Sequence, residues 1–244
     1  MSRTRLDAAL VAAGLFAARA RARDAVLRGT VSVDGRVETK PARMVGPEAV
    51  FEVSDEARNY VSRAALKLSH GLDHFGLSPA GKACIDLGAS TGGFTQVLLE
   101  RGATRVVAID VGHGQLAEVL RADPRVAVYE GVNARSLTRG QVPEDTAFIV
   151  SDLSFISLKL GLPPALALAA PGAHLLALVK PQFEVGRAHL GKGGIVTSRV
   201  QHQRACDAIA DFLHSQGWEV LGLTDSPLVG GDGNREFLIA ARKS

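Results

Sequence analysis

The sequence predicts an α/β protein built on a doubly wound, mostly parallel sheet, preceded by a small α+β module. Two observations support this fold class. From residue 60 onward, short apolar stretches alternate with helical patterns, which is typical of a parallel sheet covered by helices on both faces. Before residue 54 the chain is rich in arginine and its short elements do not alternate in this way. We therefore predict a module at 1–54, a polar linker at 55–59 and a main domain at 60–244.

The N-terminal module is expected to hold two helices and a few strands. The apolar spacing within 5–16 predicts the first helix, and a second short helix is stopped by Gly29. The dipeptide Asp34-Gly35 lies between alternating apolar residues and predicts a tight hairpin. A further strand is expected at 49–53.

In the main domain, five short apolar strands are expected at the segments ACIDL, RVVAID, VAVYE, AFIVSD and HLLALVKP. Helical patterns lie between them, for example at 92–101 and 158–170. The last two strands, WEVLGLTDSPL and REFLIAAR, flank the glycine-rich segment GGDG. They predict a hairpin added to an otherwise parallel sheet.

Composition limits the functional classes. With 244 residues, 46% of them hydrophobic, the chain can bury a full core, and its net charge of +3 permits a nucleic-acid partner without requiring one. The two cysteines lie far apart and predict neither a disulfide nor a zinc framework, and no metal is expected. The start of the chain lacks the apolar core of a signal peptide, and prolines interrupt the most apolar stretch, 160–179. We expect a cytoplasmic protein that does not act on membranes.

The stretch DLGASTGGFT, residues 86–95, follows the first apolar strand and predicts a ligand-binding turn. Its glycines do not have the G-x-G-x-x-G spacing that binds a dinucleotide pyrophosphate. In such sheets, ligands bind where the strands end at their carboxyl side. A loop that begins with an acid and lacks lysine suits S-adenosylmethionine, which has a ribose, an adenine and a cationic amino-acid tail.

Individual residues can be assigned to parts of this cofactor. Asp110 ends the second strand and can accept both ribose hydroxyls, Asp86 can attract the charged tail, and Asn133 can meet the adenine. An ordinary tight turn would explain the glycines alone, but Asp110 favours a ligand. The full predicted set is Asp86, Gly88, Ala89, Ser90, Gly92, Gly93, Phe94, Asp110, Val111, Asn133 and Asp152.

The segment after the fourth strand, SDLSF at 151–155, argues against methylation of a base. It is not the D-P-P-[YF] or N-P-P-[YF] motif that binds a base amino group. No cysteine lies near these strand ends to add to a pyrimidine ring. Amino and carbon methylation of bases are therefore disfavoured.

The C-terminal part resembles the FtsJ/RrmJ-like 2′-O-ribose methyltransferases, which have the Rossmann-like class I methyltransferase fold. The segments that carry the resemblance are DLGASTGGFT, DVGHGQL, SDLSFISL, LVKPQFEVG and NREFL. The N-terminal pattern, RLDAAL followed by VSVDG, matches an S4 RNA-binding domain. Over nearly its full length the chain is similar to the TlyA family, historically called haemolysins.

This resemblance implies a Lys-Asp-Lys-Glu catalytic tetrad, which Lys67, Asp152, Lys180 and Glu236 match in order and context. Asp152 and Lys180 also end two strands at the carboxyl edge, where the sheet opens. An uncharged Lys180 can accept the proton of a ribose 2′-OH, and a charged one can stabilise the alkoxide. The sequence does not decide between these states. Taken singly, Lys67 and Glu236 are more simply explained as surface charges.

Contacts to RNA are expected from basic residues in both parts of the chain. The loop at 191–196 is expected to touch RNA phosphates or gate the pocket, although a plain polar connection explains it equally well. A charge run is often only a solvated face, but the S4 match favours RNA. The predicted set is Arg3, Arg5, Arg19, Arg21, Arg23, Lys40, Arg63, Arg187 and Lys192.

The expected function is transfer of the methyl group of S-adenosylmethionine to a cytidine 2′-OH in ribosomal RNA, with ribosomal subunits as partners. The resemblance implies a large-subunit cytidine and, in some members, also one in the small subunit. Two alternatives stay open. One is a membrane-lysing protein, and the other is a ribosome-assembly factor that binds RNA without catalysis.

Overall fold

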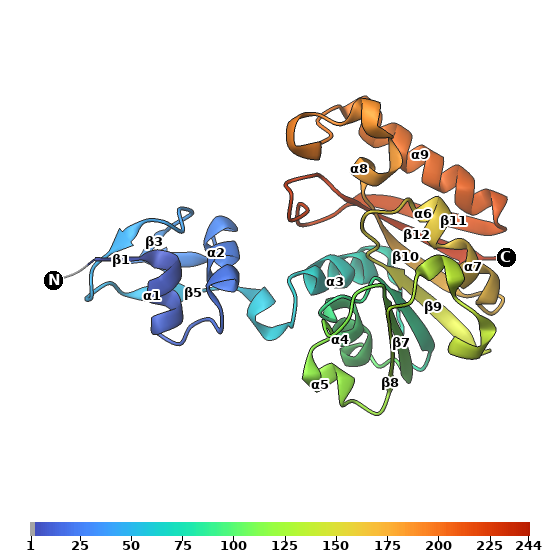
Figure 1. Cartoon of the computed structure of the whole chain (residues 1–244), viewed down its shortest axis with the longest axis horizontal. Coiled ribbons are helices and arrows are strands. Elements are labelled where there is room, and N and C mark those ends of the chain that lie inside the picture. The colour runs from blue at the N-terminus through green and yellow to red at the C-terminus, as the bar shows by residue number, and fades with distance from the viewer. Residues whose placement is uncertain (1–2) are drawn as a thin grey trace. The chain divides into compact units, whose positions relative to one another are not determined.

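The computed structural model describes residues 3–244, which form two compact units divided between Asn59 and Tyr60 (Figure 1). The first unit packs two short helices against small sheets. Its elements are β1 (Thr4–Arg5), α1 (Leu6–Ala12), α2 (Arg19–Leu27), β2 (Val31–Val33), β3 (Arg36–Val37), β4 (Met44–Val45) and β5 (Phe51–Val53).

The predicted hairpin of the first unit is confirmed. Strands β2 and β3 pair antiparallel around Asp34 and Gly35, which have φ angles of 52° and 74°. Two successive positive φ values are what a tight two-residue hairpin turn requires. Strand β5 pairs with the other edge of β2, and β1 pairs with β4. The core beneath is formed by Leu6, Leu10, Phe16, Ala22, Ala25, Val26, Val31, Val33 and Val45.

The segment expected as a polar linker has structure of its own. It contains a short 3₁₀ helix, η1 (Glu56–Asn59). Just before it, Asp55 accepts two hydrogen bonds from Arg28, of 2.7 and 2.8 Å. This fork-to-fork pair ties residue 55 to helix α2 of the first unit.

The second unit is built on a seven-stranded sheet with the order β11-β12-β10-β9-β6-β7-β8. The pairs among β6 to β10 are parallel, whereas β12 runs antiparallel to both β10 and β11. This confirms a mostly parallel sheet with a terminal hairpin. The strands are β6 (Ala83–Leu87), β7 (Arg105–Asp110), β8 (Val126–Glu130), β9 (Thr146–Ser151), β10 (His174–Val179), β11 (Trp218–Asp225) and β12 (Phe237–Lys243).

Helices cover both faces of this sheet (Figure 1). One face carries α3 (Ala64–Phe75), α4 (Gly93–Glu100) and α5 (Glu118–Arg121); the other carries α6 (Leu158–Gly161), α7 (Pro163–Leu168) and α9 (Arg199–Ser215). Shorter segments are α8 (Pro181–Glu184), η2 (Ala134–Ser136), η3 (Arg139–Gln141), η4 (Arg187–His189) and η5 (Lys192–Gly194).

The expected single helix at 158–170 is wrong in one respect, because it is divided into α6 and α7. Pro163 and Pro164 start the second helix. Proline has no backbone N–H and is tolerated only in the first turn, where no helical acceptor is needed.

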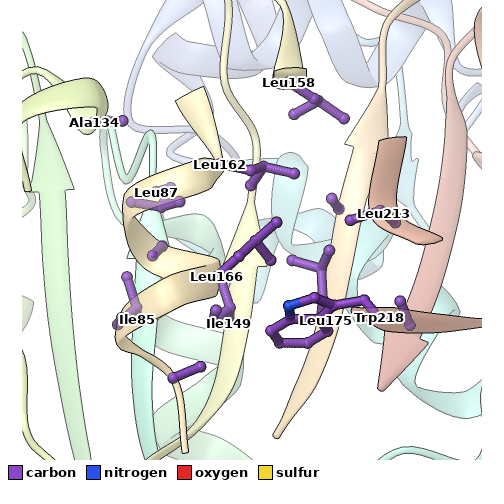
Figure 2. Packing of buried hydrophobic residues seen from close by; sticks show 14 of the residues in the cluster. Ile85, Leu87, Ala134, Ile149, Leu158, Leu162, Leu166, Leu175, Leu213 and Trp218 are labelled. Atoms are coloured by element: carbon purple, nitrogen blue, oxygen red, sulfur yellow. The ribbon is translucent and has the colours of Figure 1, made fainter. Parts of the chain in front are cut away.

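Alternating side chains of each strand divide into two hydrophobic cores. On one face, Ile149 and Leu175 pack against Leu162 and Leu166, with Trp218 beside Leu175 (Figure 2). On the other face, the intervening strand residues pack against α3 and α4. A strand buried on both faces needs apolar residues at every position, which explains the continuous apolar runs in the sequence.

Lys243 supports the carboxyl end of α7. Its Nζ donates to the carbonyl oxygens of Leu166, Ala167 and Ala169 at 3.0, 3.2 and 2.7 Å. The last carbonyl groups of a helix have no N–H partner within the helix, and some of these three carbonyls are of that kind. A positive charge is also favoured at this end of a helix.

Lys243→Met should therefore lower the free energy of unfolding by about 1–2 kcal/mol, because three carbonyls lose a charged donor. Urea denaturation of the full chain measures this. Lys192→Met, at an exposed position, is the control and should change the midpoint little. Equal midpoints for both variants would contradict the role given to Lys243.

Candidate active site

A cavity of about 830 Å³ opens at the carboxyl edge of the parallel strands. Its walls come from the loops after β6, β7, β8 and β9. This is the edge at which doubly wound sheets bind ligands. The lining residues include Gly88, Ser90, Asp110, Val111, Gly112, Gln115, Asn133, Arg135, Asp152, Ser154, Phe155 and Phe183.

The glycine loop after β6 is shaped by two close approaches. Gly88 has a φ of 83°, and a Cβ there would lie 2.8 Å from the carbonyl oxygen of Asp152. Gly92 has a φ of 98°, and a Cβ there would lie 2.3 Å from Leu120. Gly88 thus lets the loops after β6 and β9 meet at the cavity wall. Gly92 is required by its positive φ, with leucine side chains packed close to it, and it does not line the cavity or the recess beside it.

The carboxylate of Asp110 is positioned to accept hydrogen bonds from the two hydroxyls of a diol. Its Oδ1 accepts from the N–H of Gly112 at 2.7 Å, and its Oδ2 accepts from the N–H of Ser90 at 2.8 Å. A carboxylate offers about four acceptor positions, so both oxygens keep capacity for a ligand. These contacts hold the carboxylate still at the edge of the cavity.

The loop that follows Asp110 is anchored from β8. Hydrogen bonds from the backbone N–H groups of Gly114 and Gln115, with the Arg121 guanidinium, hold the pKa of Glu130 at about 2. Gln115 in turn accepts from the hydroxyl of Ser90 at 3.1 Å. Glu130 and Gln115 were not predicted as site residues from the sequence, although Gln115 lies in the segment DVGHGQL, because their contacts with other loops are not a local signal.

Asp86 lies beneath the glycine loop and does not line the cavity. Its side chain is fully buried, and Oδ2 accepts from the Thr95 hydroxyl at 2.7 Å. Burial raises the pKa of Asp86 to about 7, and the neighbouring carboxylates of Asp152 and Asp110 add to this effect. The structure therefore gives no support for direct contact between Asp86 and a cationic tail.

A smaller recess, of about 80 Å³, lies at the start of α4. It is lined by residues of the glycine loop together with Ser62, Ala64 and Asp152. Asp152 lines both this recess and the main cavity.

The four residues of the predicted tetrad form two ion pairs at this edge. Lys67 Nζ lies 2.5 Å from Glu236 Oε2, and Lys180 Nζ lies 2.6 Å from Asp152 Oδ1. The β10–β12 register pairs Val179 with Phe237, so the chain brings Lys180 and Glu236 to neighbouring positions. Both lysines and Glu236 are buried.

The loop after β9 holds two residues that sequence reasoning missed. Ser154 Oγ accepts from Lys180 Nζ at 2.7 Å. Phe155 is 92% exposed, has a φ of 64°, and its ring lies 5.4 Å from that of Phe183. A positive φ is uncommon for a bulky residue, and such backbone often marks functional sites. Only their place beside the strand-ending Asp152 hinted at these roles.

Asn234 links two loops near Glu236. Its buried side chain accepts from the N–H of Val196 at 2.9 Å and donates to the carbonyl of Gly194 at 3.2 Å. It also donates to Asp232. The segment 186–196 is therefore fastened at its end, while the side chains of Arg187 and Lys192 are exposed.

In the first unit the predicted RNA-binding arginines differ in their surroundings. Arg5 hydrogen-bonds the buried Asp7 and lowers the pKa of that carboxyl to about 2, with help from Arg19 at 3.2 Å. Arg21 donates to the carbonyl of Ala57. Arg3, Arg23 and Lys40 are exposed. In the second unit, Arg63 is partly buried just before α3. Arg5 and Arg19 thus have structural partners as well as exposed faces.

Among residues 3–244 there is no group of three or more His, Cys, Asp or Glu side chains that could hold a metal ion. The two cysteines are buried and unpaired.

The chain matches two protein families. Residues 60–243 match the FtsJ-like methyltransferases, and residues 4–51 match the S4 domain. It is 46% identical to the 16S/23S rRNA (cytidine-2′-O)-methyltransferase TlyA of Mycobacterium tuberculosis, over 98% of this chain and 90% of that protein.

Two further relatives carry the name haemolysin. Hemolysin A of Brachyspira hyodysenteriae is 37% identical over 96% of this chain and 98% of that protein. A solved haemolysin-named structure from Streptococcus thermophilus is 39% identical, covers 100% of this chain and 90% of that one, and has a TM-score of 0.78. The chain therefore belongs to the TlyA family, in which an S4 domain precedes an FtsJ-like methyltransferase fold.

Proposed function

We propose that this protein transfers the methyl group of S-adenosylmethionine to the ribose 2′-OH of a cytidine in ribosomal RNA. The observation that carries the proposal is the Lys180–Asp152 pair, which lies beside a cavity that suits this cofactor. The 46% identity to an rRNA (cytidine-2′-O)-methyltransferase supports the substrate.

The cavity residues fit the cofactor part by part. Asp110 can accept from the ribose hydroxyls, and Val111 and Asn133 lie where the adenine would extend. The recess with Gly88, Gly93 and Asp152 suits the amino-acid end. When bound, S-adenosylmethionine supplies an electrophilic methyl group.

The residues of this chain then have to activate a poor nucleophile. A ribose hydroxyl is a very weak acid, so Lys180 must accept its proton or stabilise the negative charge that develops on its oxygen. Asp152 fixes the position of Lys180 and balances its charge when it is protonated. Burying two lysine–carboxylate pairs is costly, and the β10–β12 register brings Glu236 next to Lys180. We assign Lys67 and Glu236 to the same site on this ground.

The basic residues of the first unit and the segment 186–196 are proposed to bind RNA. Structured RNA is recognised mostly through its shape and its backbone, which suits dispersed arginines better than a base-reading motif. We propose residues 1–54 as the RNA-binding module and 60–244 as the catalytic domain. A ribosomal substrate would place the protein in the cytoplasm.

Membrane lysis is the second candidate, on the strength of the relatives' names alone. Within residues 3–244, the structure contains no helix with the length and apolar character needed to cross a bilayer. A liposome-leakage assay with the purified chain tests this candidate directly. Methyl incorporation into ribosomal subunits separates the proposed function from a non-catalytic assembly factor.

Asp110→Ala should weaken binding of S-adenosylmethionine by about 10-fold or more, because charge-assisted hydrogen bonds are worth roughly 1.5–3 kcal/mol. Isothermal titration calorimetry measures the Kd. Asp211→Ala, on the exposed face of α9, is the matched control. Equal affinity of wild type and Asp110→Ala would place the ribose elsewhere.

Lys180→Ala should lower the methylation rate by roughly 10²–10⁴-fold while leaving cofactor and RNA binding almost unchanged. Single-turnover incorporation of labelled methyl groups into ribosomal subunits measures the rate. Lys180→Arg should fail as well, since a guanidinium does not release its proton near neutral pH. If Lys180→Arg restores the methylation rate, Lys180 acts only as a positive charge. If Lys180→Ala keeps the wild-type rate, the assignment of Lys180 to catalysis is wrong.

Replacing Arg19, Arg21 and Arg23 by glutamine should make RNA binding less sensitive to salt. The slope of log affinity against log salt concentration should become smaller in magnitude by roughly 2, because fewer counterions are released. Filter binding at several salt concentrations measures the slope. The matched control changes Arg105, Arg125 and Arg242, which are exposed at the opposite edge of the sheet. The control should leave the slope unchanged, and an unchanged slope in the test variant would place the RNA-binding surface elsewhere than α2.

A further inference from the structure

We propose that Ser154 is a positioning residue that orients the Lys180 amine toward the ribose hydroxyl. This inference rests on the proposed function, since it concerns how the same site activates its nucleophile. Ser154 does not belong to the four-residue tetrad, which contains no serine.

The hydroxyl of Ser154 is one of two groups that lie at short distance from the Lys180 amine. Lys180 Nζ lies 2.6 Å from Asp152 Oδ1 and 2.7 Å from Ser154 Oγ. Its next contact, to the carbonyl of Asp152, is long at 3.5 Å. Both close partners lie on the loop after β9 and both line the cavity. Two residues of one loop therefore contact the amine at short distance.

The valence of nitrogen gives these contacts a chemical meaning. An uncharged lysine amine has two N–H bonds and one lone pair. Ser154 Oγ accepts one N–H bond of the amine at 2.7 Å, and the Asp152 carboxylate lies 2.6 Å from the nitrogen as its ion-pair partner. Because Ser154 fixes the direction of one N–H bond, it limits the directions open to the lone pair of the uncharged amine and to the remaining N–H bonds of the charged one.

The loop around Ser154 is held in place on the side that faces α8. The ring of Phe155 lies against that of Phe183, and Glu184 accepts hydrogen bonds from the Ser157 hydroxyl and the N–H of Leu158 at 2.5 and 2.9 Å. The positive φ of Phe155 is maintained within this turn. Because Lys180 directly precedes α8, the same contacts fix Ser154 and Lys180 relative to each other.

Ser154→Ala should lower kcat by roughly 10- to 100-fold, because an oriented hydrogen bond to the amine is lost. The KM for ribosomal RNA and the Kd for S-adenosylmethionine should stay within about two-fold of wild type, as expected when only transition-state stabilisation is removed. Ser154→Thr keeps the hydroxyl and should recover most of the rate. Ser215→Ala, whose hydroxyl bonds the far end of α9, is the matched control.

A double-mutant cycle distinguishes positioning from a structural defect. In the Lys180→Ala background, Ser154→Ala should cause no further loss of the single-turnover rate, because Ser154 acts through Lys180. A further loss in that background, a raised KM with unchanged kcat, or failure of threonine to restore the rate would each overturn the inference. If wild type methylates no ribose 2′-OH, the proposed function fails; if wild type is active and Ser154→Ala equals it, only the role of Ser154 fails.

Discussion

The site depends on a single geometric constraint, which is that the loops after β6 and β9 meet within van der Waals contact. A Cβ at Gly88 would lie 2.8 Å from the carbonyl oxygen of Asp152, so no other side chain fits at this position without moving one loop. This contact closes the wall between the large cavity and the small recess, and Asp152 lines both. Any displacement of the loop after β9 would move Asp152 and Ser154 away from Lys180 together. Cofactor binding and activation of the hydroxyl are therefore supported by one piece of backbone.

Electrostatics impose a second constraint on this edge. Asp86, Asp110 and Asp152 lie close enough that the latter two help raise the pKa of Asp86, although burial is the larger cause. Lys67 is paired with Glu236 and Lys180 with Asp152. The carboxylates that line the cavity are those of Asp110 and Asp152. S-adenosylmethionine carries positive charge on both its sulfonium and its amino group, so these two acids suit the cofactor at the edge where we propose that Lys180 acts on the hydroxyl.

The sequence was sufficient to predict the sheet, its terminal hairpin and the strand ends that carry Asp110, Asp152 and Lys180, because the apolar pattern of each strand is a local signal. It did not predict what depends on the direction of a side chain. Asp86 belongs to the glycine motif, yet its side chain turns beneath the loop toward Thr95. Ser154 looked like an ordinary loop serine, and only the packing of β9 beside β10 brings it to Lys180. These contacts join residues far apart in the chain, so no local pattern contains them.

The chemistry of the site also explains why an RNA-binding module is needed. Every ribonucleotide carries a 2′-OH, so a lysine tuned to that hydroxyl cannot by itself select one nucleotide. Contacts to phosphates fix register and orientation without reading bases, and structured RNA is distinguished largely by shape. In the first unit, Asp7 holds Arg5 and Arg19 in defined positions while leaving their outer faces exposed. Arginines fixed in this way lose less side-chain entropy on binding than freely moving ones, so they suit recognition of one RNA shape. Selection of the nucleotide then rests on how the RNA fits the basic surfaces, and the Lys180 site can act on a hydroxyl that all nucleotides share.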